Sequence, residues 1–268
     1  MGRSIHPSAI VEEGATLGEN VKVGPFCHIG GEVHLGDGCV LQSHVALAGR
    51  THVGPGTRIF PFASIGHPPQ DLKYAGEPST LEIGAGNIIR EHVTMNPGTK
   101  GGGMRTVVGD RNLFMMGAHI AHDCRVGNDC VFANNATLGG HVAIEDGAIV
   151  GGLAAVHQFV RVGTYAMIGG LSAVVQDVIP YGMVFGDRAT LQGLNWIGLK
   201  RAGTDRETLK LMRQAFRQLF DAEGAIGERI DAVATEYGGD PKVRRIVDFM
   251  SAESDRGLCL PESSGDAA

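Results

Sequence analysis

The amino-acid sequence predicts a mainly β protein: a parallel β-helix of hexapeptide repeats followed by a C-terminal α-helical domain. Two observations lead to this fold class. An aliphatic residue recurs at every sixth position over long stretches of residues 1–188, and over residues 189–268 the apolar spacing becomes that of amphipathic helices. The composition agrees, because 41 of the 268 residues are glycine and only 6% are aromatic. A core of small aliphatic side chains is therefore expected.

The hexapeptide repeat runs in two registers. Counting in sixes from Ile5 reaches Ile65 on aliphatic residues alone, and counting from Val108 reaches Val174 with an aliphatic or phenylalanine each time. Glycine often follows this residue, and a small residue stands four places after it. A period of six fits a chain that turns a corner after every short strand, with glycine at the turn. Three hexads then form a triangular coil of about 18 residues, and coils stack as parallel strands about 4.8 Å apart.

Four cysteines occupy the small interior position of the repeat, namely Cys27, Cys39, Cys124 and Cys130. We therefore interpret them as buried structural residues. The chain has five cysteines and no CxxC pair, which argues against a disulfide framework and against a four-thiolate zinc site.

Two segments interrupt the count. Residues 67–80 (HPPQDLKYAGEPST) are polar and contain proline, and residues 100–104 (KGGGM) shift the register by one residue. Loops that leave a rigid scaffold commonly carry function. Both are therefore candidate functional loops.

Three helices are predicted in the C-terminal domain, where they would cap the last coil. Thr204 and Glu207 match a capping box at the start of the first helix. The second is expected to end at Gly238, and the third to follow Pro241. We expect disorder over residues 257–268. The apolar positions that define the first two helices are Leu209, Met212, Phe216 and Leu219, then Ile226, Ile230, Val233 and Tyr237.

The charge balance and the N-terminal sequence limit the class of protein. The net charge is -6, with 23 basic and 29 acidic residues, so a general nucleic-acid-binding surface is not indicated. The N-terminus lacks an apolar secretory segment, and no run approaches the ~18 apolar residues of a membrane span. We expect a cytoplasmic protein with no integral membrane segment.

The first predicted helix carries one basic face. Arg206, Lys210, Arg213 and Arg217 follow one another at spacings of three or four residues, within an acidic chain. This face is either a solvated helix surface or a docking patch for an acidic partner.

Histidines cluster in the second register, at intervals close to one coil. His122 and His141 are 19 residues apart, Asp123 and His141 are 18 apart, and His141 and His157 are 16 apart. These side chains are expected near one corner of successive coils, with His119 close by. Each histidine could simply be an exposed polar residue, and three together could bind zinc. The adjacent His122 and Asp123 favour a general base supported by a carboxylate.

The sequence resembles the UDP-N-acetylglucosamine O-acyltransferase family. The similar strings are QDLKYAGEP (70–78), AHIAHDCRVGN (118–128), FANNATLGGHV (132–142), AVHQFVRVG (155–163) and GLNWIGLKR (193–201). The hexads also resemble those of hexapeptide-repeat acyltransferases generally, whose coils are left-handed. A left-handed β-helix is adopted from this resemblance, against the general right-handed preference of parallel crossovers.

The resemblance implies transfer of a (3R)-3-hydroxyacyl group from acyl carrier protein to the 3-hydroxyl of UDP-N-acetylglucosamine, the first step of lipid A biosynthesis. His122 matches the catalytic base, Asp123 its orienting partner, and Gly140 the backbone N–H that stabilises the oxyanion. No cofactor and no metal are implied. Family members are homotrimers with active sites between the prisms.

The resemblance also implies further binding residues. His119 would lie along the acyl pocket, Gly170 would admit a long chain, and the basic helix face would dock the carrier protein. The residues expected to hold the sugar nucleotide are Asp71, Lys73, His141, His157 and Gln158, with Asn195 and Arg201 towards its phosphate and base.

Three alternatives stay open at this point. The chain could be the related N-acyltransferase, or a member that acts on a 3-amino sugar nucleotide. It could be a zinc carbonic anhydrase built on the same repeat. It could also be a noncatalytic coiled scaffold.

Overall fold

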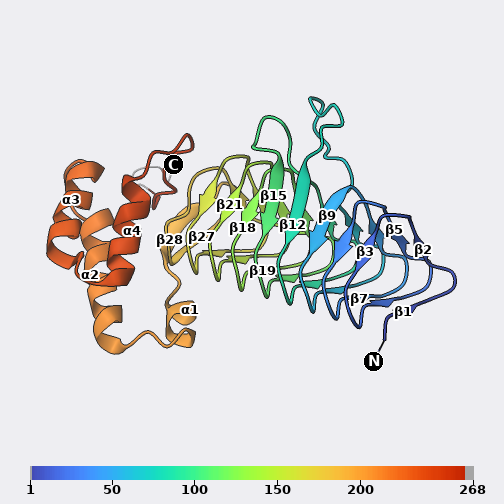
Figure 1. The fold of residues 1–268 in the computed structure, drawn as a ribbon. Coiled ribbons are helices and arrows are strands. Elements are labelled where there is room, and N and C mark those ends of the chain that lie inside the picture. Colours follow the sequence, from blue (N-terminus) through green and yellow to red (C-terminus); the bar gives the residue numbers. More distant parts are fainter. Residues whose placement is uncertain (1, 263–268) are drawn as a thin grey trace.

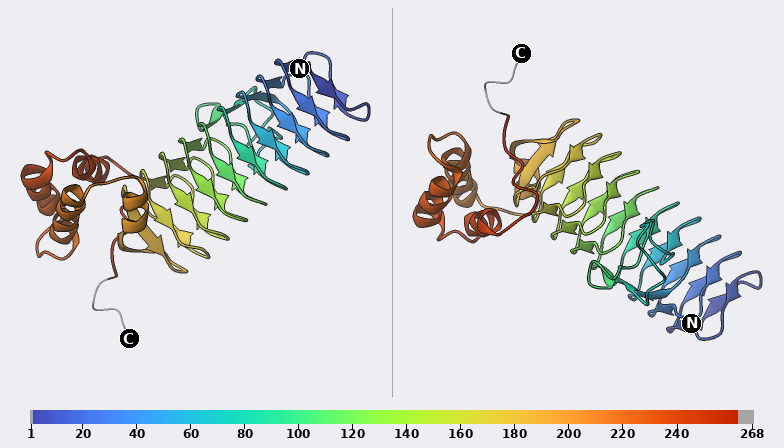
Figure 2. Two further views of the ribbon diagram at one scale, coloured as in Figure 1. Left: turned by 90° about the horizontal axis from the view of Figure 1, so that it is seen from below. Right: turned by 90° about the horizontal axis from the view of Figure 1, so that it is seen from above.

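The computed structural model describes residues 2–262 and shows a long three-sided prism with a helical cluster at one end (Figure 1). Two further views show coils of similar outline stacked along one axis, as the sequence predicted (Figure 2). The strands wind as a left-handed parallel β-helix, which confirms the predicted fold class. No helix in this part of the chain is both long and apolar enough to cross a membrane.

Within residues 2–262 the strands form three sheets, one on each side of the prism, which we name A, B and C. Neighbouring strands are parallel except at the C-terminal end of sheet A. Sheet A contains β1 (Ser4–Ile5), β4 (Lys22–Val23), β7 (Val40–Leu41), β10 (Arg58–Ile59), β13 (Ile88–Ile89), β16 (Leu113–Phe114), β19 (Val131–Phe132), β22 (Ile149–Val150), β25 (Met167–Ile168), β27 (Gly182–Phe185) and β28 (Thr190–Leu194). Sheet B contains β2 (Ile10–Val11), β5 (His28–Ile29), β8 (Ala46–Leu47), β11 (Ser64–Ile65), β14 (Thr94–Met95), β17 (His119–Ile120), β20 (Thr137–Leu138), β23 (Ala155–Val156) and β26 (Ala173–Val174). Sheet C contains β3 (Thr16–Leu17), β6 (His34–Leu35), β9 (Arg50–Val53), β12 (Thr80–Ile83), β15 (Arg105–Val108), β18 (Arg125–Val126), β21 (Ala143–Ile144) and β24 (Arg161–Val162).

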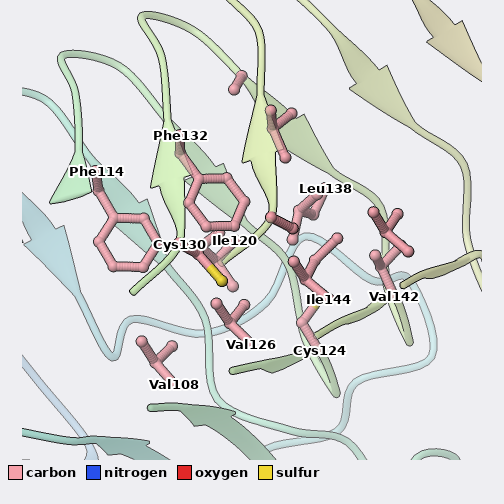
Figure 3. Close-up of a cluster of buried hydrophobic side chains, with 14 of the residues drawn as sticks. Val108, Phe114, Ile120, Cys124, Val126, Cys130, Phe132, Leu138, Val142 and Ile144 are labelled. Atoms are coloured by element: carbon pink, nitrogen blue, oxygen red, sulfur yellow. The ribbon is translucent and has the colours of Figure 1, made fainter. Parts of the chain in front are cut away.

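The repeat residues form the core of the prism. In most strands the second residue is buried, and the first faces outward. Phe114 and Phe132 stack inside the prism with ring centroids 4.9 Å apart (Figure 3). Cys130 lies beside Phe132, and Cys124 lies farther along the prism next to Ile144 (Figure 3). Burial raises the thiol pKa of each cysteine to about 12. The predicted interior cysteines are thus buried, free thiols.

Both interruptions lengthen a turn at the same edge, the one between sheets B and C (the B–C edge). The turn of residues 66–79 is the first insertion, and the turn of residues 96–104 is the second insertion. Strand partners in regular coils are 18 residues apart, as Ile120 and Leu138 are. Ile65 pairs with Met95, which is 12 residues more than 18, and Met95 pairs with Ile120, which is 7 residues more. The first insertion therefore preserves the hexad register and the second shifts it by one. Both rise from the same side of the prism (Figure 1).

In the described part of the chain, four helices follow the sheets: α1 (Trp196–Arg201), α2 (Arg206–Phe220), α3 (Ile226–Tyr237) and α4 (Pro241–Ser251). The predicted end of α3 at Gly238 and the start of α4 at Pro241 are both observed. The N-cap of α2 differs from the prediction. Asp205, not Thr204, caps this helix by accepting hydrogen bonds from the backbone N–H groups of Glu207 and Thr208.

The β-sheet structure continues past the predicted domain boundary at residue 188. Strand β28 folds back antiparallel on β27 and extends sheet A to Leu194. The short helix α1 was not predicted.

The segment after α4 returns to the prism, whereas disorder was expected from residue 257. Asp177 pairs with Leu258, and the buried thiol of Cys259 donates to the carbonyl of Ala189. Arg256 donates to the carbonyl of Gln158. These contacts order the segment up to residue 262, and residues 263–268 lie outside the described part of the chain.

Replacing Phe132 by alanine tests the stacked core. Phe132 is fully buried, so Phe132→Ala leaves a cavity and is expected to lower the free energy of unfolding by about 3–5 kcal/mol. Urea unfolding followed by circular dichroism measures the loss. Leu72→Ala is the control, because Leu72 is fully exposed and its truncation should change stability by less than about 0.5 kcal/mol. Equal effects of the two substitutions would contradict the assigned core.

Candidate active site

The B–C edge gathers the predicted histidine cluster in neighbouring coils. His122 and Asp123 lie in the turn from β17 to β18, and His141 lies in the equivalent turn of the next coil, from β20 to β21. Asp123 and His141 both have positive φ, of 60° and 64°. The imidazole rings of His122 and His141 pack edge to face, with their centroids 5.1 Å apart. The predicted corner is thus observed.

His122 and Asp123 form a hydrogen-bonded pair. Nδ1 of His122 lies 2.8 Å from Oδ2 of Asp123. The Asp123 side chain is fully buried, whereas that of His122 is 14% exposed. Because Nδ1 is occupied by the carboxylate, Nε2 is the ring nitrogen available to a ligand.

The second insertion supplies the other partners of Asp123. The backbone N–H of Thr99 donates to Oδ1 at 2.9 Å, and the Thr99 hydroxyl donates to Oδ2 at 2.6 Å. Gly102 packs so closely on the carboxylate that a Cβ at this position would collide with it. These contacts hold the carboxylate in one place.

Gly140 lies one coil above His122 and leaves room for its ring. A Cβ on Gly140 would stand 2.5 Å from Cε1 of His122 and 2.7 Å from Nε2. Among the described residues, the N–H of Gly140 has no protein acceptor. In the corresponding turn of an earlier coil, the N–H of Gly31 donates to the carboxylate of Glu12. The Gly140 backbone, whose N–H has no protein acceptor among the described residues, therefore lies beside His122.

A cavity of about 320 Å³ is lined by His122 and Gly140. Its lining includes His119, His122, Gly140 and Gln158, and Gln70 and Asn96 from the insertions. Burial lowers the pKa of His119, and the proximity of His122 adds to this effect. Burial also lowers the pKa of His141, although the charge of Asp123 opposes the change. Both rings are therefore held towards the neutral form.

The first insertion places Gln70 in the lining of this cavity, and Asp71 and Lys73 follow it in the chain. Asp71 is close enough to His141 to influence its pKa, and its carboxylate accepts from the backbone N–H of Lys73. The Lys73 side chain is exposed. The two insertions are joined, because Glu77 accepts from the backbone N–H of Lys100 at 2.9 Å.

Three other predicted residues lie farther along the prism. His157 and Gln158 occupy the B–C edge in the coil after His141, and both are exposed. Gly170 is exposed in the turn from β25 to β26, at the edge between sheets A and B (the A–B edge). The structure thus brings His157 and Gln158 to the His122 edge and places Gly170 across sheet B.

Asn195 and Arg201 are not brought to the His122 cavity within one chain. They line a separate cavity of about 670 Å³ between sheet A and α1. Asn195 is the N-cap of α1, accepting from the N–H of Gly198 and donating to the carbonyl of Tyr165. Any role for Arg201 at the His122 site requires a neighbouring copy of the chain.

The basic face on α2 is exposed at all four positions, which are Arg206, Lys210, Arg213 and Arg217. The Arg213 guanidinium lies over the ring of Trp196, 5.1 Å from its centroid. Arg213 therefore has an intramolecular contact.

His122, Asp123 and His141 also have the composition of a metal site. One ligand atom from each lies within 4.8 Å of the others. In this geometry Nδ1 of His122 and Oδ2 of Asp123 are hydrogen-bonded to each other, which is the arrangement of a proton-transfer pair.

Sequence reasoning missed Thr99, Gly102 and Glu77. The only sequence signal for them was that residues 67–80 and 100–104 interrupt the hexad count. The contacts of the three residues are made across coils, so neither spacing nor composition reveals them.

Comparison with known proteins agrees with the geometry. A family model described as UDP-N-acetylglucosamine O-acyltransferase, domain 2, matches residues 177–259. A second, described as bacterial transferase hexapeptide (six repeats), matches residues 14–49 and 105–140.

Similar proteins match nearly the whole chain. Acyl-[acyl-carrier-protein]--UDP-N-acetylglucosamine O-acyltransferase from Rhizobium johnstonii is 51% identical over 96% of this chain and 94% of its own. The protein of the same name from Sinorhizobium fredii is 52% identical over 97% of each chain. A solved structure of Francisella novicida UDP-N-acetylglucosamine acyltransferase superimposes with a TM-score of 0.93 at 36% identity, covering 97% of this chain and 95% of that one. With this identity over this length, the chain belongs to the UDP-N-acetylglucosamine O-acyltransferase family.

Proposed function

We propose that this protein transfers a (3R)-3-hydroxyacyl group from acyl carrier protein to the 3-hydroxyl of UDP-N-acetylglucosamine, with His122 as general base. The observation that carries the proposal is the buried Asp123 carboxylate 2.8 Å from Nδ1 of His122, beside the N–H of Gly140. The names of the similar proteins supply the two substrates.

The proposed step is an attack of the sugar hydroxyl on the thioester carbonyl. Nε2 of His122 takes the hydroxyl proton as the new C–O bond forms, and the charge of Asp123 stabilises the resulting imidazolium. The carbonyl oxygen becomes an oxyanion that the N–H of Gly140 can stabilise. The C–S bond then breaks, and the proton held by His122 passes to the leaving thiolate.

Sheet B offers a path for the acyl chain. Thr137, Ala155 and Ala173 follow His119 in register on the outer face of this sheet. These side chains are small, so an extended chain can cross from His122 to Gly170 at the A–B edge. The sugar nucleotide would then bind on the B–C edge, held by Asp71, Lys73, His141, His157 and Gln158.

A homotrimer would complete the site. The A–B edge exposes Phe26, Phe62, Met116, Leu153 and Leu171, a row of apolar side chains suited to contact with other copies. In a trimer the cavity with Asn195 and Arg201 can face the His122 edge of the neighbouring copy. The proposed nucleotide contacts of these two residues rest on this arrangement.

The exposed basic face of α2, with Lys210 near its centre, is the proposed docking surface for the acidic carrier protein.

We also place the protein in the cytoplasm. The five cysteines are all free thiols, which fits a reducing compartment.

Replacing His122 by alanine removes the proposed base. His122→Ala is expected to leave a folded protein with transfer reduced about 10²- to 10⁴-fold. Mass spectrometry of the product from UDP-N-acetylglucosamine and a series of 3-hydroxyacyl carrier proteins measures the rate and identifies the bond. Near-normal turnover in the variant would exclude His122 as the base. Transfer to the 3-amino analogue of the sugar nucleotide, with none to UDP-N-acetylglucosamine, would instead point to the amino-sugar alternative.

Gly140→Ala tests the space around the base. The new methyl group would displace the His122 ring, so transfer should fall on the order of 10²-fold with little loss of stability. Gly30→Ala is the matched control on the same edge, since its Cβ would meet no atom closer than 3.4 Å. If Gly140→Ala turns over like wild type, the proposed geometry of the site is wrong.

Mixed trimers test the shared site. His122→Ala and Arg201→Ala are each expected to be weakly active alone. When the two variants are unfolded and refolded together, about a quarter of the sites receive both intact residues, if each site spans two chains. The mixture should then regain about a quarter of wild-type transfer. No gain over the separate variants would place both residues in one chain's site or exclude Arg201.

A further inference from the structure

We propose that Thr99 is a positioning residue that fixes the Asp123 carboxylate and thereby holds His122 in place. The inference rests on the proposed function of His122. Thr99 lies in the second insertion and touches neither ring of the histidine pair through any hydrogen bond, so its effect passes through Asp123.

The geometry around Asp123 carries the inference. The Thr99 hydroxyl and Nδ1 of His122 meet the same oxygen, Oδ2, at 2.6 and 2.8 Å. The Thr99 N–H holds the other oxygen, Oδ1, at 2.9 Å. Thr99 is 3% exposed, so water does not readily replace these donors. The carboxylate is therefore held in one orientation, with one oxygen directed at His122.

The insertion that carries Thr99 packs directly against the Asp123 carboxylate. Gly102 packs against it without room for a side chain, and the backbone N–H of Asp123 donates to the Thr106 hydroxyl at 2.8 Å. Glu77 accepts from the N–H of Lys100, next to Thr99. A hydrogen bond from the second insertion to the first therefore lies next to the residue, Thr99, that contacts Asp123.

Thr99 also affects the charge that His122 experiences. The titratable groups facing His122 are Asp123 in its own turn, His141 in the next coil and His119 on the preceding strand. A hydroxyl that donates to Oδ2 draws negative charge away from the His122 hydrogen bond. Without it, Asp123 would stabilise the imidazolium more strongly, and His122 would become protonated at a higher pH.

The test compares Thr99→Val, Thr99→Ala and Thr99→Ser with Thr51→Val. Thr51 is a buried threonine whose hydroxyl donates to the carbonyl of Ala48, away from the site, so it is a matched control. The readouts are kcat and KM for UDP-N-acetylglucosamine, with product detected by mass spectrometry, and the pH titration of the His122 ring followed by NMR.

We expect Thr99→Val and Thr99→Ala to lower kcat about 10- to 100-fold with KM changed less than about twofold. The titration midpoint of His122 should rise by about 0.5–1 pH unit. Thr99→Ser should restore both values towards wild type, and Thr51→Val should change neither.

A wild-type kcat and His122 midpoint in both Thr99→Val and Thr99→Ala would overturn the inference, as would a rise in KM alone. If wild-type protein itself fails to transfer the acyl group, the proposed function fails. The NMR titration then still decides whether Thr99 controls the His122–Asp123 pair.

Discussion

The 18-residue register of the stacked coils is the constraint on which the site depends. Parallel strands only two residues long are held by pairing with the coils on either side, so each residue repeats its position in the next coil. That register places Gly140 beside His122 and His141 beside Asp123. The apolar second residue of each strand fills the interior and keeps the register fixed. A rigid edge results, on which side chains from separate coils meet.

The chemistry depends on two departures from this register. Both insertions leave the B–C edge, where a turn can lengthen without breaking the strand pairs on either side. Their residues then fold back onto the edge and join each other through Glu77 and Lys100. A regular coil could present His122, but the buried partners of Asp123 come from the second insertion. Thus the prism sets positions, and the insertions set the environment of the reacting groups.

Much of the fold could be predicted because the hexad pattern is local. Each aliphatic, glycine and small residue is read from a window of six, and the helices α3 and α4 have clear ends at Gly238 and Pro241. The grouping of His122, Asp123 and His141 also followed from coil length. The Thr99 contact could not be predicted, since it joins residues 24 positions apart through an irregular turn. The hydrogen bond from Asn195 to the carbonyl of Tyr165, and the return of Cys259 to the prism, are likewise tertiary contacts. The separation of Arg201 from His122 appears only when the sheets are placed in space.

The role of the second insertion is tested most directly by the activity of a chain from which residues 98–104 are deleted. The deletion removes Thr99 and Gly102 and brings Met95 to the regular six-residue spacing from Val108. We predict a stable β-helix, by circular dichroism and thermal unfolding, that has lost acyl transfer by at least about 10²-fold. A folded deletion variant that transfers the acyl group at the wild-type rate would contradict the claim that the insertion completes the site.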